Sequence, residues 1–122
     1  MGLPWVRLDA NIASHDKTIK ALGHRNGKGA MALYVFALGW SGGQGTDGHI
    51  PAAALPMLHG SKAEANVLEA VELWDADPDG DGWWVRNWAR RQEASDITAS
   101  KREKARKAAL ARWGTPNVRA IK

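Results

Sequence analysis

The acidic segment at residues 75–81 holds the residue types most able to do chemistry. Three aspartates alternate with other residues and a glycine follows, which matches the first six positions of a calcium-binding loop. The twelfth position of such a loop needs a bidentate glutamate, but here it is Arg86, and the residues that follow the acidic segment predict a strand. We therefore expect an acidic hairpin turn, in which Asp, Pro and Gly serve turn geometry, and no calcium binding.

No other pattern in the chain indicates catalysis or a cofactor. Residues 23–28 are one residue short of a phosphate loop, lack Ser or Thr after Lys28 and follow no predicted strand. The chain has no nucleophile elbow and no His-Glu-x-x-His motif, and no two histidines are four residues apart. We expect a protein that is not an enzyme and has no catalytic residues, metal or cofactor. The histidines are His15, His24, His49 and His59.

Basic residues are concentrated at the C-terminal end of the chain. Residues 1–85 hold six Lys and Arg against ten Asp and Glu, a net charge of −4. Residues 86–122 hold eleven against three, a net charge of +8. Such an asymmetry is typical of a basic arm that faces a polyanion, with nucleic acid first and an acidic protein or a membrane surface second. The alternative is a solvated helix that keeps a small protein in solution.

We expect the basic arm to bind DNA through phosphates rather than bases. Its cations are spread too widely around a helix to form one base-reading face, and no Asn or Gln among residues 101–112 can pair with adenine. Phosphate contacts position a protein on DNA without reading its sequence. The expected DNA-binding residues are Arg90, Arg91, Lys101, Arg102, Lys104, Arg106, Lys107 and Arg112.

The composition is that of one globular domain with an appendage. Of 122 residues, 44% are hydrophobic and 25% are charged, which excludes wholesale disorder. The absence of cysteine excludes disulfides and thiolate metal sites. The longest apolar run, residues 30–40, is too short to span a bilayer, and residues 1–16 contain no apolar signal region. We expect a cytoplasmic protein with no membrane partner.

Two helices are predicted before residue 48. Ser14 caps a short helix that ends at Gly23, because serine accepts from the free N–H groups of the first turn. The second helix, at residues 30–40, is apolar on nearly every side and should be central, with the glycine-rich residues 41–48 ending it. The residues expected on one face of this helix, at positions i, i+3, i+4 and i+7, are Met31, Tyr34, Val35 and Leu38.

The next elements are shorter. Residues 49–51 are extended, and the helix at 52–59, with Leu55 and Leu58 facing inward, is distorted by Pro56. Ser61 and Glu64 form a capping box that begins a better helix. Its expected buried stripe is Ala63, Val67, Leu68, Val71 and Trp74.

A two-stranded hairpin and a basic helix complete the prediction. The strands are residues 73–76 and 82–88, and alternation points Trp83 and Trp84 to opposite faces. Ser95 caps a final helix that runs to about Trp113 and carries most of the basic arm.

This order of elements predicts a mainly α, α+β fold, a winged helix-turn-helix with a small β-hairpin wing and a basic C-terminal helix. We expect the winged helix-turn-helix domain at residues 1–94 and the basic helix and tail at residues 95–122. The sequence leaves the oligomeric state open.

Parts of the chain resemble phage proteins. Residues 5–11 with Lys17 and Leu22 look like the start of phage replisome-organiser N-terminal domains, and residues 73–74, 83–88 and Gln92 resemble their wing and exit. Residues 101–106 are similar to a basic stretch that follows this exit in small actinobacteriophage proteins. The resemblance covers residues 5–113 and implies a DNA-binding or replication-accessory role in a phage, in the cytoplasm of a bacterial host.

The helix that would enter the major groove departs from this pattern, as does the wing. Both carry carboxylates, which repel DNA phosphates. One interpretation is that DNA is held by the basic arm. The alternative is a protein-interaction module in which the acidic helix and wing bind a host or phage replication protein. Its candidate residues are Glu64, Glu69, Glu72, Asp75, Asp77, Asp79 and Asp81.

Overall fold

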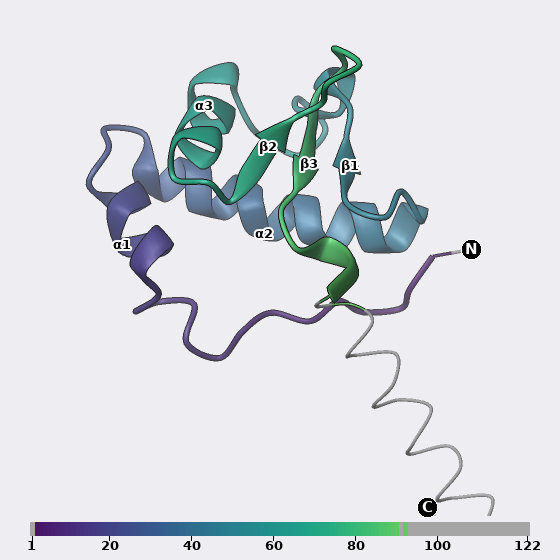
Figure 1. Cartoon of the computed structure of the whole chain (residues 1–122), viewed down its shortest axis with the longest axis horizontal. Coiled ribbons are helices and arrows are strands. Elements are labelled where there is room, and N and C mark those ends of the chain that lie inside the picture. The colour runs from purple at the N-terminus through teal and green to yellow at the C-terminus, as the bar shows by residue number, and fades with distance from the viewer. Residues whose placement is uncertain (1, 91, 93–122) are drawn as a thin grey trace, which may run out of the picture. The chain divides into compact units, whose positions relative to one another are not determined.

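The computed structural model describes residues 2–90 and 92 of the chain (Figure 1). Its elements are the α-helices α1 (Asp16–Leu22), α2 (Gly27–Gln44) and α3 (Lys62–Ala70), the 3-10 helix η1 (Ala52–Ala54), and the strands β1 (His49–Ile50), β2 (Trp74–Ala76) and β3 (Trp83–Val85). The expected α+β fold class is confirmed.

Contacts along the chain define two units. The first is Met1–Ala89 and the second is Arg90–Lys122, of which the structure describes Arg90 and Gln92. The predicted final helix capped by Ser95 therefore lies outside the described residues.

The three strands form one antiparallel sheet in the order β1-β3-β2. β2 lies close to the expected first strand of the hairpin, but the second strand is shorter than the predicted residues 82–88. It ends at Val85, because Asn87 adopts a left-handed φ of 63° and residues 88–90 are helical. A left-handed residue breaks the extended backbone that a strand requires.

Helix α1 begins one residue later than predicted. Its N-cap is His15, whose Nδ1 accepts from the Lys17 backbone N–H at 3.2 Å, whereas the Ser14 hydroxyl donates to the Asn11 carbonyl. The imidazole nitrogen thus caps the helix in place of the serine oxygen that the sequence predicted. The predicted end of the helix at Gly23 is confirmed.

Helix α2 does not end at the glycine-rich segment as predicted. It starts at Gly27, runs through Gly42 and ends at Gln44, with Gly45 in the left-handed conformation as its C-cap. Packing explains the internal glycine, because a Cβ at Gly42 would overlap Val6 Cγ1. The N-terminal segment lies at this end of α2, and the Leu3 N–H donates to the Gly42 carbonyl at 2.7 Å.

Helix α2 was expected to be central, but one side of it is not covered by other elements. α1, α3 and β1 all pack against it, and Leu33, Tyr34 and Leu38 are buried in the core that they share. Val35, which was expected on the same face as Tyr34 and Leu38, is 42% exposed. The neighbouring elements cover only part of the helix, so its remaining apolar side stays at the surface.

Helix α3 begins with the predicted capping box. The Ser61 hydroxyl accepts from the Glu64 N–H at 3.2 Å, and the Glu64 carboxylate accepts from the Ser61 N–H at 2.9 Å. Its buried stripe uses Ala65 in place of the expected Ala63, which is exposed.

The segment between β1 and α3 is only partly helical. The 3-10 helix η1 stops at Ala54, short of the predicted residue 59. Leu55 and Leu58 are buried as expected, and the predicted distortion around Pro56 is confirmed, since turns replace the helix there.

Tryptophans fix the hairpin to the helices. Trp74 is fully buried and lies beside Trp83 with ring centroids 5.5 Å apart, while Trp84 on the opposite face is 40% exposed. The predicted alternation of Trp83 and Trp84 is confirmed. Trp88 is also buried, and its Cβ lies so close to Gly48 (φ of 95°) that no side chain fits there.

Candidate functional site

Arg86 joins the carboxylates on one side of the hairpin. Its Nε donates to Asp75 Oδ2 at 3.1 Å, its Nη2 donates to Asp75 Oδ1, and its Nη1 lies 3.4 Å from Glu72 Oε1. The hydrogen bond from Arg86 lowers the pKa of Asp75, and the same contact raises the pKa of Arg86. The pairing follows from the antiparallel register, in which the Arg86 N–H donates to the Leu73 carbonyl.

His49 organises the other side of the hairpin. It is paired with Trp84 across the β1–β3 ladder, and the two rings lie 4.7 Å apart. Its Nε2 is 3.3 Å from Asp77 Oδ2. The Asp79 backbone N–H, which donates to Asp77 Oδ1 at 3.0 Å, lowers the pKa of Asp77, and His49 and Trp84 add to the shift.

The remaining acidic residues also have partners within the chain, with one exception. Asp81 Oδ1 accepts from the Ala52 N–H at 3.2 Å, and Glu69 Oε1 accepts from the Trp83 indole N–H at 3.1 Å. Glu64 belongs to the capping box. Of the seven carboxylates proposed for protein interaction, only that of Asp79 has no partner among the described residues.

The aspartates of the turn do not converge on a common point. Both oxygens of Asp75, the first position of the calcium-loop pattern, accept from Arg86, the residue at the twelfth position. Within residues 2–90 and 92, no three His, Cys, Asp or Glu side chains gather in a group that would hold a metal ion.

The structure describes one of the eight predicted DNA-binding residues. Arg90 is exposed. The other seven lie outside the described residues, namely Arg91, Lys101, Arg102, Lys104, Arg106, Lys107 and Arg112.

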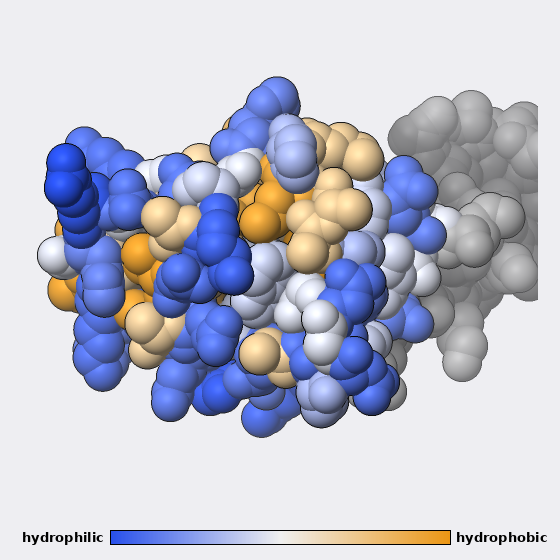
Figure 2. Space-filling model, turned by 90° about the horizontal axis from the view of Figure 1, so that it is seen from above, coloured by the Kyte–Doolittle hydropathy of each residue, from blue (hydrophilic) through white to orange (hydrophobic). Residues whose placement is uncertain are grey.

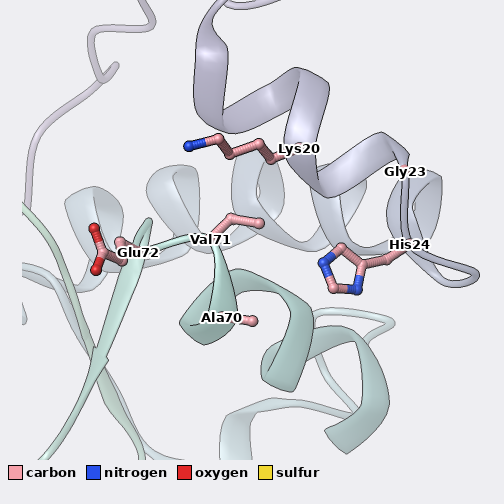
Figure 3. A pocket seen from close by; sticks show the side chains of 6 residues that line it. All are labelled: Lys20, Gly23, His24, Ala70, Val71 and Glu72. Carbon is pink, nitrogen blue, oxygen red and sulfur yellow. The ribbon is translucent and has the colours of Figure 1, made fainter.

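An open depression of about 560 Å³ separates the end of α1 from the end of α3 (Figure 3). Lys20 and His24 line it from the α1 side, and Ala70, Val71 and Glu72 line it from the α3 side. Lys20 is already paired with Asp16 at 3.1 Å. Only Glu72 among the predicted site residues lies here, so the depression gathers no site that the sequence predicted.

Apolar surface is the second feature that the sequence did not predict. Seen from above, orange side chains reach the surface near the α1 end and over the middle of the molecule (Figure 2). On α1 the exposed apolar residues are Ile19 and Leu22, and on α2 they are Val35 and Phe36. The signal was present in α2, which has no charged residue between Gly29 and Gln44.

Comparisons of the chain with protein-family models, with curated proteins and with solved structures found no match. The resemblance to phage replisome-organiser proteins therefore stays a prediction. Over the part of the chain that the structure describes, every helix is too short or too polar for a bilayer crossing.

Proposed function

We propose that this chain is a non-enzymatic, phage-type DNA-binding protein with a replication-accessory role, which holds DNA phosphates mainly through its basic C-terminal arm, residues 90–112. One observation carries the proposal. The basic arm has a plausible internal partner in the acidic helix and hairpin, yet six of the seven carboxylates there already accept hydrogen bonds or ion pairs from the first unit. The carboxylates of the first unit are thus already engaged, whereas an external polyanion would offer the cations of the arm anionic groups without such partners.

The order of elements supports the winged-helix part of the proposal. In this interpretation α2 is the first helix, η1 and α3 form the helix-turn-helix, and the β2–β3 hairpin is the wing. The sheet order β1-β3-β2 places β1 beside the hairpin, as that interpretation requires.

The charge of α3 and the hairpin argues that phosphate contacts come from elsewhere. The exposed side of α3 presents Lys62 and Asn66, but Glu69 lies next to them and the aspartates of the turn follow. Arg86, the one cation of the hairpin, is held by Asp75 and Glu72. The arm is thus the part of the chain best suited to bind the phosphate backbone.

A salt titration of DNA binding tests the proposal. For about 4–6 phosphate contacts, log K against log salt concentration should have a slope of roughly −4 to −5, with little difference between duplex sequences. Replacing Lys101, Arg102, Arg106 and Lys107 with Ala should remove most of the affinity and leave the thermal melt nearly unchanged, because alanine is the best helix former.

The matched control removes four cations from the first unit instead. Lys17→Ala, Lys20→Ala, Arg25→Ala and Lys62→Ala together lower the net charge equally, so they separate local contact from total charge. We expect this variant to keep most of its affinity. Equal losses in the two variants would mean that the affinity follows the total charge and not contact with the arm, which would contradict the proposal. Wild-type protein that binds no duplex at low salt would also refute it.

One observation favours the protein-interaction alternative. Trp84 is 40% exposed on the outer face of the hairpin, with His49 and Asp77 beside it. Exposed tryptophans with a polar rim are typical anchors of protein interfaces. In this alternative the hairpin binds a host or phage replication protein, and Trp84→Ala abolishes that binding without changing DNA affinity.

A further inference from the structure

The outward face of α2 is apolar and long, and the first unit covers it only in part. Ala32, Val35, Phe36, Gly39 and Gly43 recur at spacings of three and four residues, so they form one stripe along the helix, and all five are exposed. Phe36 is 49% exposed, and its ring lies in an edge-on arrangement with that of His59, at 5.8 Å between centroids. A stripe of this kind is the surface that another helix buries.

Two glycines in the stripe have no explanation within the first unit. A Cβ built at Gly42 would overlap Val6, and one at Gly27 would overlap the Ala21 carbonyl, so those glycines are required by their neighbours. A Cβ at Gly39 or Gly43 would meet nothing within 4 Å. Glycine is less favourable than alanine inside a helix, so open space on both residues points to a backbone that approaches from outside.

Four residues of the stripe, Ala32, Val35, Phe36 and Gly39, are symmetric about a centre between Val35 and Phe36. In an antiparallel pair of α2 helices with a two-fold axis at this point, Val35 of one copy faces Phe36 of the other. Ala32 then faces Gly39, where two small residues allow close approach of the helices. A two-fold interface uses the same patch on both subunits, and this stripe meets that condition.

Charge along α2 also favours an antiparallel second copy. The first turn has Lys28 and no acidic residue, which is the opposite of what the helix dipole prefers, and the last turn has no basic residue to balance the dipole there. The same two-fold axis brings Lys28 opposite Gly43 of the other copy, four residues before Asp47 in the sequence. Both Lys28 and Asp47 are exposed and have no partner among the described residues.

We propose that the chain forms a two-fold homodimer through the outward face of α2, with Phe36 and Val35 at its centre, Ala32 against Gly39, and Lys28 paired with Asp47 of the second copy. This proposal is independent of the proposed function. If both hold, each dimer carries two basic arms.

The test is the mass of the full chain in solution by analytical ultracentrifugation. We expect twice the chain mass of 13.2 kDa at about 100 µM, where a dimer with a micromolar Kd is nearly saturated. Gly39→Leu should convert it to the monomer without loss of helical circular dichroism, because the first unit leaves space for the new side chain. Phe36→Glu should do the same.

The matched control is Ile19→Glu, which places the same charge on an apolar residue of α1 that is 57% exposed, and which should leave the dimer intact. Lys28→Glu and Asp47→Lys should each weaken the dimer, and the double variant should restore it. Wild-type protein with the mass of one chain overturns the proposal, whatever else covers α2, and so does a Gly39→Leu variant that still dimerises.

Discussion

The acidic hairpin and the outward face of α2 differ in how many of their side chains have partners in the same unit. Around the hairpin, a dense set of charges is held by donors from the same unit, with Arg86, His49 and backbone N–H groups each contacting carboxylates. On α2, an apolar stripe faces open space. The charge of the hairpin makes it the first candidate for an interaction surface. The contacts favour α2 instead, because the groups of the hairpin already have partners and the stripe on α2 does not.

The largest effect should come from removing the core residue that supports the hairpin. Trp74 is fully buried at the start of β2, so Trp74→Ala should cost about 3–5 kcal/mol. This is a large part of the roughly 5–15 kcal/mol that holds a domain folded. Thermal melting measures the loss, and Trp84→Ala is the control, because Trp84 lies on the exposed side of the same sheet. Equal melting temperatures for the two variants would show that the hairpin does not depend on Trp74.

A pair of glycine substitutions separates covered from uncovered parts of α2. A Cβ at Gly27 would overlap backbone atoms of Ala21 and Leu22, so Gly27→Ala should destabilise the fold by about 1–3 kcal/mol. Gly39→Ala meets nothing and should stabilise the monomer by about 0.5–1 kcal/mol. Urea unfolding at low protein concentration measures both. If both substitutions change the free energy of unfolding in the same direction, the distinction between covered and uncovered parts of α2 is wrong.

The smallest effect should be the pH dependence of the ion pair in the hairpin. The pKa of Asp75 is lower in the folded protein than its ordinary value of 3.8, because Arg86 donates to the charged form. The stabilisation is therefore complete above that ordinary value and is lost as the pH falls through the lower folded value. Asp75→Asn should melt earlier than wild type at pH 7, and the difference should shrink towards zero in stronger acid. A difference that stays constant with pH would mean that the substitution acts through packing.

The elements were predictable where local chemistry decides them. The capping box of Ser61 and Glu64 and the opposite faces of Trp83 and Trp84 depend only on residues close in sequence, and all were found as predicted. The far end of α2 was not, because Gly42 reads as a helix breaker until Val6, distant in the sequence, is seen to occupy the space of its missing side chain.

The contacts of the candidate site were less predictable for the same reason. In the sequence, Arg86 counts among the basic residues of 86–122 and stands where a calcium loop needs a glutamate, yet its partners are Asp75 and Glu72. Only the strand register brings these groups together. The register can be derived only after the ends of the strands are known, and the sequence did not give the end of the second strand correctly. The exposure of Val35 depends on which sides of α2 other elements cover, and hydrophobic periodicity alone does not decide that when a helix is apolar on nearly every side.

Trp88 has a mechanical consequence. Its indole contacts the α2 end at Gly42, and its Cβ lies against Gly48, so it is the last large side chain anchored in the first unit. A load applied to the C-terminal end of the chain, as when a bound polymer is pulled, would reach the fold at this ring before it reached β3. Under tension we therefore expect the Trp88 ring to be displaced before strand β3 is pulled.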